Sequence, residues 1–170
     1  MISILSKIDA SLGKYSSPSD TDNENTSKIL SEAGFVVEAN KDYLIYDKSN
    51  NPICISLVDS YNSGKYKLEE VLKQVDTFTI MVTHEPDLIK ELNTENMPDI
   101  MLSGNTVGGE IKLPFIGPIK KFKGSNKYYK EEYTVNSTNL YISNGLGTKK
   151  TFLRLFNRPS FTVFRLKSKN

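Results

Sequence analysis

The sequence lacks several features, and each absence excludes a class of protein. It has one cysteine, Cys54, so no internal disulfide can form. Because Cys54 lies in the apolar run 53–58, we expect a buried, reduced thiol, as is typical of a cytoplasmic protein. No apolar stretch approaches the roughly 18 residues needed to span a bilayer. The N-terminal residues 1–5 are followed at once by Lys7 and Asp9, which is not typical of a signal peptide. We therefore expect a cytoplasmic protein with no membrane segment.

The sequence also lacks a strong charge of either sign. Its 170 residues carry a formal net charge of +2, so bulk charge predicts no particular partner. Five lysines gather near two tyrosines in residues 120–130, a pattern that favours a solvated loop or an edge strand protected by lysine. A nucleic-acid accessory protein is the alternative reading, but nucleic acid is not the expected partner. These lysines are Lys120, Lys121, Lys123, Lys127 and Lys130.

In the first half of the chain, apolar spacing predicts two helices and then three strands. Residues 4–12 have helical spacing with Gly13 as a stop, and a second helix carrying Ile29, Leu30 and Ala33 ends at Gly34. Turn-forming residues separate the three apolar runs that follow, which indicates successive strands of a meander. The predicted strands are residues 35–37, 43–46 and 53–57.

The second half of the chain predicts a βαβ unit. A helix over residues 67–75 precedes a buried strand at 78–82, and Pro86 can occupy the first turn of the next helix. A further strand at 99–102 completes the unit, so a parallel strand pair is expected. Ligands bind at the carboxyl ends of such strands, where His84 and the loop 104–109 fall. Residues 140–143 and 161–164 are expected to be further strands.

Two segments at that edge carry the most informative residues. They are Thr-His-Glu-Pro-Asp at residues 83–87 and Gly-Asn-Thr-Val-Gly-Gly-Glu at residues 104–110. The segments resemble the C-terminal metal-binding motifs of the calcineurin-like metallophosphoesterases, in which the second motif usually reads Gly-His-Thr-His-Gly-Gly-Gln. Further segments resemble the same family in the same order along the chain. These are residues 12–15 with 18–22, 144–148 and 154–159.

The resemblance implies an α/β fold in one domain over residues 1–170, a partial phosphoesterase sandwich with mixed β-sheets flanked by helices. The family opens with strands ending in Asp-x-His and Gly-Asp, and neither pair occurs in this chain. We therefore expect a C-terminal portion of the domain that lacks the N-terminal strands. Because an apolar sheet face and open strand edges would then be exposed, a homodimer or a tight protein partner is expected to cover them.

The resemblance also implies a remnant metal site. His84 aligns with a histidine ligand, and Asp20 aligns with the family's asparagine ligand. Asn105 replaces a ligand of the same metal, and its amide oxygen is a weaker donor. Thr21 replaces the histidine that acts on the leaving group, while Val107, which cannot coordinate, replaces a ligand of the second metal. At most one weakly bound divalent metal is therefore expected, with Mn, Zn or Fe as candidates.

The glycines of the second motif have a separate interpretation. Gly104, Gly108 and Gly109 are expected to keep unusual backbone angles, and their NH groups would form a small anion-binding loop. Glu85 and Glu110 are expected to be solvated rather than catalytic.

Two functions follow as hypotheses. The first is a catalytically degenerate metallophosphoesterase-like protein that acts as a binding or interaction module, in which case this chain alone is not an enzyme. The alternative is a metal-dependent phosphohydrolase that is active only when a separate polypeptide supplies the N-terminal half. Thr21 and Val107 argue against the alternative, because a supplied half would not restore those two ligands.

Overall fold

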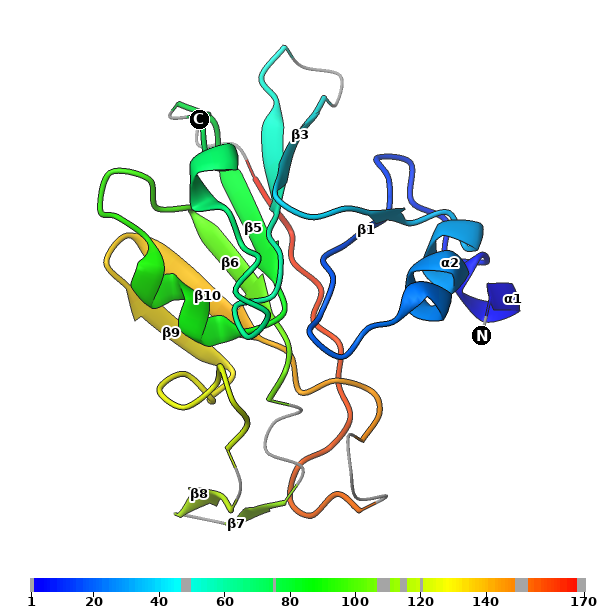
Figure 1. Cartoon of the computed structure of the whole chain (residues 1–170), viewed down its shortest axis with the longest axis vertical. Helices are drawn as coiled ribbons and strands as arrows, with labels where there is room; N and C mark the ends of the chain where they lie inside the picture. Colours follow the sequence, from blue (N-terminus) through cyan, green and yellow to red (C-terminus); the bar gives the residue numbers. More distant parts are fainter. Residues whose placement is uncertain are drawn as a thin grey trace.

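The computed structural model of the chain describes residues 2–46, 50–74, 76–106, 111–113, 116–119, 121–148 and 153–167. Its main feature is a six-stranded mixed sheet (Figure 1). The strands are β3 (Lys41–Ile45), β4 (Ile53–Leu57), β5 (Thr79–Thr83), β6 (Ile100–Ser103), β9 (Glu132–Val135) and β10 (Thr138–Ile142).

The order of these strands is β3-β4-β5-β6-β10-β9. The four central strands are parallel, while β3 and β9 are antiparallel edges. The expected α/β class is thus confirmed, as is the parallel pairing of β5 with β6. Cys54 on β4 is fully buried, as predicted, and burial raises the pKa of its thiol.

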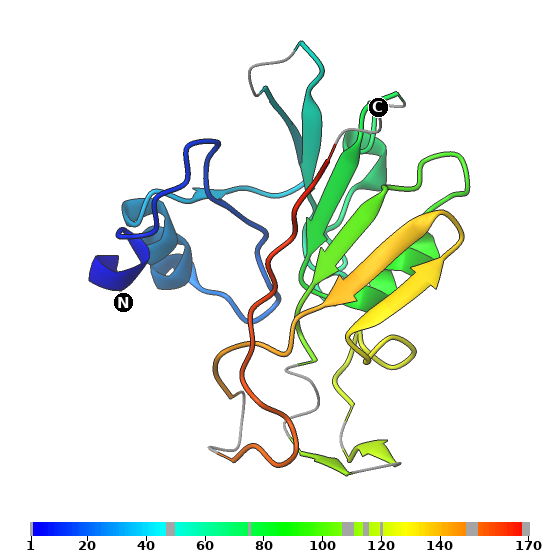
Figure 2. The same cartoon turned by 180° about the vertical axis from the view of Figure 1, so that it is seen from behind.

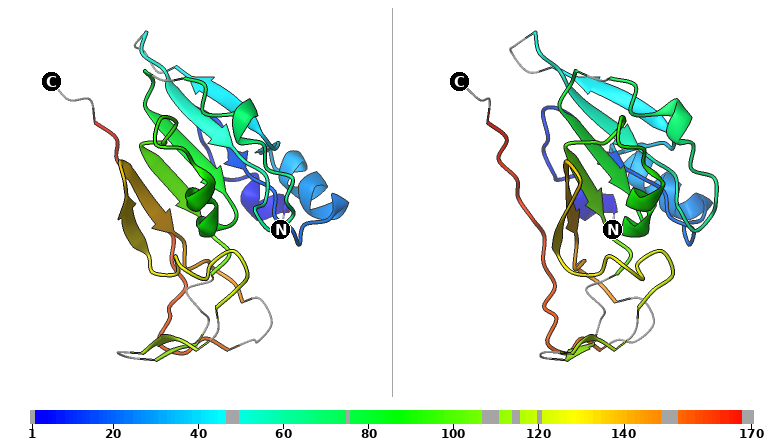
Figure 3. Two further views of the ribbon diagram at one scale, coloured as in Figure 1. Left: turned by 60° about the vertical axis from the view of Figure 1, so that its left-hand side comes forward. Right: turned by 90° about the vertical axis from the view of Figure 1, so that its left-hand side faces the viewer.

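The hydrophobic core lies on one face of this sheet. Alternate strand residues point into it, and Met81, Met101 and Leu140 are completely buried. The 3-10 helix η2 (Pro86–Glu91) covers them with Leu88 and Ile89, and Figure 3 shows it on this side of the sheet. Pro86 occupies the first turn as predicted. Burying each of these side chains contributes roughly 1.5–3 kcal/mol.

The N-terminal segments form a separate layer beside the sheet (Figure 1). Here β1 (Tyr15–Ser16) pairs in parallel with β2 (Val36–Val37). The predicted meander is therefore right for the antiparallel pair β3–β4 and wrong for residues 35–37, which pair with a strand upstream. The expected helix before Gly34 is present as α2 (Glu24–Glu32), and Gly34 has a φ of +83°.

The first predicted helix is much shorter than its apolar spacing indicates. Only α1 (Ile2–Leu5) is helical. Ile4, Ile8 and Leu12 are 70%, 49% and 49% exposed, so most of the apolar stripe is left in solvent. A short helix without tertiary packing is marginal in water, which explains the difference.

The predicted helix over residues 67–75 is also wrong. Only η1 (Leu68–Glu70) is helical, as a 3-10 turn, and Val75 lies outside the described residues. Val71 is already extended, with a φ of −122°, and Leu72 then takes a φ of +58°, so the helix does not continue. The N–H groups of Leu72 and Lys73 donate to the Asp42 carboxylate on β3, each at 3.3 Å. A hydrogen-bond acceptor from a distant strand thus competes with the helical carbonyls.

The other face of the sheet is followed by the C-terminal segment (Figure 2). Residues 161–164 are not a strand, contrary to the prediction, but the ring of Phe164 packs on Tyr141 with centroids 4.7 Å apart. A cavity of about 390 Å³ lies between this segment and strands β6 and β10. Phe161 and Val163 remain 78% and 80% exposed. The partner expected to cover this face stays a prediction.

A small hairpin, β7 (Lys112–Leu113) with β8 (Gly117–Pro118), lies at the far end of the molecule from β3 (Figure 1). None of the helices in the described ranges is both long and apolar enough to cross a membrane.

Candidate metal-binding site

His84 and Gly104 lie side by side at the carboxyl edge of the sheet, as the βαβ pattern predicts. Their preceding residues, Thr83 and Ser103, are paired in register at the ends of β5 and β6. The Gly104 N–H donates to the His84 carbonyl at 3.1 Å. This bond holds the two loops together. His84 is half-buried, and its Nδ1 lies 4.0 Å from a Cβ built on Gly104.

Asp20 reaches the same edge from the N-terminal layer. It is exposed on a turn in which the Ser19 N–H donates to Asp22 Oδ2 at 2.9 Å. The Ser17 hydroxyl donates to the carbonyl of Val58, directly after β4, and so ties this segment to the sheet. Thr21, on the same turn, shares a hydrogen bond of 3.0 Å with the Ser19 hydroxyl.

Glu85 is the residue that sequence reasoning missed. It is fully buried, so the expectation of a solvated side chain is wrong. Its Oε1 accepts from the Ser60 hydroxyl at 2.9 Å and from Asn62 Nδ2 at 3.2 Å, and its Oε2 accepts from the Tyr61 N–H at 2.8 Å. The sequence signal was its place beside His84 at a strand end, but its partners lie 23–25 residues away.

The charge state of Glu85 reflects this environment. Burial raises the pKa of its carboxyl above the ordinary value, and the nearby negative charge of Asp20 raises it further. The hydrogen bonds from Ser60 and Tyr61 lower the pKa in opposition. A cation placed between the two carboxylates would remove the repulsion between Glu85 and Asp20.

Three side chains with metal-binding atoms converge here. In the described part of the chain, one ligand atom each from Asp20, His84 and Glu85 lie within 4.8 Å of one another. Ligands on opposite sides of a metal bound at about 2.0–2.2 Å are roughly 4–4.4 Å apart. The exposed turn of Asp20 would need only a small movement inward to close this gap. Two carboxylates and an imidazole are a donor set that suits Mn, Zn or Fe, so the residues fit a divalent cation.

Asn105 is held through its amide nitrogen, and its expected role as a weak metal ligand through the amide oxygen stays a prediction. It is 5% exposed, and its Nδ2 donates to the Lys123 carbonyl at 2.6 Å and to Ser125 Oγ at 2.9 Å. Its φ is +59°, whereas Gly104 has no positive φ, so the unusual backbone angle predicted at Gly104 falls on Asn105 instead. Asparagine tolerates this conformation better than most residues. Val107, Gly108, Gly109 and Glu110 lie outside the described residues.

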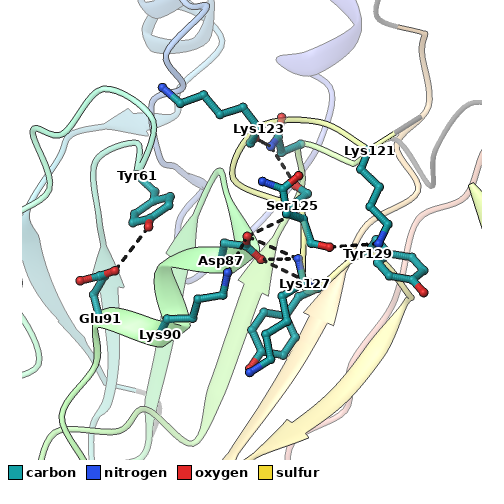
Figure 4. Close-up of polar contacts among 12 residues, drawn as sticks. Tyr61, Asp87, Lys90, Glu91, Lys121, Lys123, Ser125, Lys127 and Tyr129 are labelled. Atoms are coloured by element: carbon teal, nitrogen blue, oxygen red, sulfur yellow. Dashed lines mark hydrogen bonds and ion pairs between the residues drawn. The ribbon is translucent and has the colours of Figure 1, made fainter. Parts of the chain in front are cut away.

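Residues 121–130, which we call the lysine loop, close one side of the site. Its lysines are exposed as predicted, and Lys120 lies outside the described residues. The loop is anchored by Asp87, which is 2% exposed and accepts from the backbone N–H groups of Asn126, Lys127 and Tyr128 at 3.0–3.2 Å (Figure 4). Lys90 Nζ donates to the same carboxylate at 2.8 Å.

The Asp87 carboxylate is suited to this anchoring role. Burial acts to raise its pKa, but the hydrogen bonds from Lys90 and from the loop outweigh burial, so the pKa lies below its ordinary value. The charged form is therefore the one that holds the loop.

A hollow of about 680 Å³ adjoins Asp20, and no residue of the lysine loop lines it. Its lining is rich in carboxylates, among them Asp22, Glu24 and Asp59, with Lys65 as the cation. Neither His84 nor Glu85 lines it, so the hollow is a neighbour of the cluster rather than its binding cavity.

The chain is similar in sequence to two curated proteins of Bacillus subtilis (strain 168). The uncharacterized metallophosphoesterase YkuE of Bacillus subtilis (strain 168) is 32% identical over 178 aligned residues, covering 100% of this chain and 62% of YkuE. The uncharacterized protein YpbG of the same organism is 29% identical over 133 residues, covering 77% of this chain and 48% of YpbG. The chain thus spans less than two thirds of the length of either relative. No protein-family model and no solved structure matches it. The metallophosphoesterase-like relationship read from the motifs is thus confirmed by the similarity to YkuE, which extends over the whole chain.

Proposed function

We propose that this chain is a catalytically degenerate metallophosphoesterase-like protein whose remaining site binds a single divalent cation, and that it acts by binding rather than by hydrolysis. The observation that carries the proposal is the convergence of Asp20, His84 and Glu85 within 4.8 Å. The Asp20 carboxylate comes from the N-terminal turn, whereas His84 and Glu85 are consecutive residues after β5. Long-range hydrogen bonds fix both segments at the sheet edge, through Ser17 for the first and through Glu85 and the His84 carbonyl for the second.

The donor set supports binding better than it supports turnover. Two-metal phosphoesterases polarise the phosphate, generate hydroxide near neutral pH and stabilise both entering and leaving oxygens. Here Thr21 offers only a hydroxyl where an imidazole is expected, and it is hydrogen-bonded to Ser19. Asn105 directs its amide nitrogen to the lysine loop. One cation with incomplete ligands supplies charge to hold an oxyanion but leaves the leaving group without an acid.

Each residue of the cluster has a distinct part in this proposal. Glu85 is held by three donors and would provide the fixed ligand. His84 would offer one imidazole nitrogen, with its backbone carbonyl tied to Gly104. Asp20, on its exposed turn, would move to complete the site. A bound divalent cation would act as a Lewis acid towards an oxyanion.

The first test is calorimetric titration of the purified chain with Mn²⁺ and Zn²⁺. We expect stoichiometric binding with a Kd of about 10 μM, equivalent to roughly 7 kcal/mol. His84→Ala and Asp20→Asn should weaken binding at least about tenfold, because each removes a ligand. Asp9→Asn removes an exposed carboxylate that is not part of the cluster and is the matched control, with wild-type affinity expected. Equal affinities in all four proteins would contradict the proposed site.

The second test addresses hydrolysis directly. With Mn²⁺ present, the chain should not hydrolyse a generic substrate such as bis(p-nitrophenyl) phosphate above the rate of free metal. Metal-dependent turnover that is lost in His84→Ala would refute catalytic degeneracy while leaving the metal site intact. Cytoplasmic location and a covering protein partner remain predictions of the sequence that these two tests do not address.

A further inference from the structure

The backbone of Lys123 is fixed between residues that border the Asp20–His84–Glu85 cluster. Asn62 Nδ2 donates both to the Lys123 carbonyl at 3.1 Å and to Glu85 Oε1 at 3.2 Å. From the other side, Asn105 Nδ2 donates to the same carbonyl at 2.6 Å. The Lys123 carbonyl therefore connects the partner of Glu85 with the loop that follows β6.

The next residue places Lys123 still closer to the cluster. A Cβ built on Gly124 would lie 2.5 Å from Glu85 Cγ, so the backbone of Gly124 is packed directly on the Glu85 side chain. Consecutive Cα atoms are about 3.8 Å apart. The Cα atom of Lys123 is thus one residue away from the contact between Gly124 and Glu85. The four-carbon side chain of Lys123 is flexible and can place its ammonium group over the cluster.

The ammonium group of Lys123 is available for a ligand, unlike those of its neighbours. Lys121 donates to the Asn126 carbonyl and lies 4.3 Å from the centre of the Tyr129 ring. Lys127 lies over the Tyr128 ring, and Lys90 is paired with Asp87. The Lys123 side chain is exposed and extends away from these groups (Figure 4). Among the described residues, no ion pair involves Lys123.

We propose that Lys123 is an anion-binding residue of the candidate metal site, where its ammonium contacts an oxyanion, such as a phosphate group, that is coordinated to the cation. This inference rests on the proposed function. The charges of the site explain why a further cation is required. A divalent cation is neutralised by the carboxylates of Asp20 and Glu85, so an anion at the open side of the cation gains little net attraction from the cluster alone. Lys123 supplies the missing positive charge.

The experiment uses inorganic phosphate as the probe and the Mn²⁺-loaded chain as the host, in calorimetric titrations at low ionic strength. Four proteins are compared: wild type, Lys123→Met, Lys123→Arg and Lys130→Met. Lys130 is an exposed lysine of the same loop, beyond the hydrogen bonds to Asn62 and Asn105, and it is the matched control. Mn²⁺ affinity and thermal stability are measured separately for each protein, so that loss of metal or fold is not mistaken for loss of the anion contact.

We expect Lys123→Met to weaken phosphate binding about five- to tenfold, with Mn²⁺ affinity unchanged, because a charge-assisted hydrogen bond is lost. Lys123→Arg should stay within about twofold of wild type, since the charge is kept. Unchanged phosphate affinity in Lys123→Met, or an equal loss in Lys130→Met, would overturn the inference. If Mn²⁺ does not bind the wild type, the proposed function fails. The same phosphate titrations are then made on the metal-free chain, and they test whether Lys123 contacts the anion. Phosphate binding that depends on Lys123 would then support the anion contact, and its absence would overturn it.

Discussion

Gly124 lies directly against Glu85, and the contact leaves no room for a side chain at position 124. An added Cβ would come within 2.5 Å of Glu85 Cγ and 2.8 Å of Glu85 Cβ, and the φ of Gly124 is +77°. Glycine is therefore required here both by its backbone conformation and by the space available. The contact joins the lysine loop to the buried carboxylate of the candidate metal site.

Gly124→Ala is expected to destabilise the protein by about 2–4 kcal/mol, from positive-φ strain together with the clash against Glu85. The measurement is the free energy of unfolding by urea. Gly64→Ala is the matched control, because Gly64 has a φ of +67° with nothing within 4 Å of its added Cβ, so it should cost only about 1–2 kcal/mol. An equal loss of unfolding free energy in the two variants would mean that the contact between Gly124 and Glu85 does not contribute to stability.

Asp87→Asn should destabilise the chain by roughly 2–4 kcal/mol. In the wild type the backbone N–H groups donate to a charged carboxylate, whereas in the variant they would face an amide nitrogen that cannot accept. Glu91→Gln, an exposed change whose carboxylate accepts only from Tyr61 at 3.3 Å among the described contacts, should stay within about 0.5 kcal/mol of wild type. Hydrogen exchange of the Asn126, Lys127 and Tyr128 amides checks the mechanism. Unchanged protection of these amides in Asp87→Asn would contradict the anchoring role.

Divalent metal should stabilise the folded chain by mass action. At a free Mn²⁺ concentration about 100 times the Kd, stabilisation is about 2.7 kcal/mol, which for a domain of this size raises Tm by roughly 5–10 °C. Chelation with EDTA should reverse the shift, and His84→Ala should abolish it. A shift of the same size in His84→Ala would mean that the metal binds elsewhere.

The core face of the sheet should tolerate truncation far less than its edge. Leu140→Ala removes a fully buried side chain on β10 and should cost about 2–5 kcal/mol. Leu44→Ala, the same change at a side chain that is 40% exposed on edge strand β3, should cost about 1 kcal/mol or less. Chemical denaturation of both variants gives the comparison, and similar costs would place the core elsewhere.

A homodimer or a tight protein partner is expected to cover exposed apolar surface. Phe161, Val163 and Ile116 are 77–80% exposed, and Phe156 is 67% exposed. Large exposed apolar side chains are typical of interaction sites where they adjoin one another. Light scattering should detect a dimer, or a hydrophobic dye should bind the monomer. A monomer at high concentration that binds no dye would contradict this expectation.

Local sequence pattern was enough to locate the elements that carry the site. The apolar runs at β4, β5 and β6 and the turn residues between them are short-range signals, and the βαβ order placed His84 at the ligand edge. The motif resemblance assigned Asp20 to the same site as His84, although 64 positions separate the two residues in the chain. The strand and turn predictions succeeded because burial and turn chemistry act on neighbouring residues.

Tertiary structure alone decided the features that depend on distant partners. Glu85 looks like a solvated loop residue until Ser60 and Tyr61 reach it from the end of β4. The helix expected at residues 67–75 is lost because Asp42 on β3 binds its backbone N–H groups. A sequence window contains neither partner, and a hydrogen bond with a distant residue can outweigh the local preference of the chain. The sequence by itself therefore determined the parallel strands β4, β5 and β6 and the family resemblance, and the tertiary structure decided that Glu85 joins Asp20 and His84.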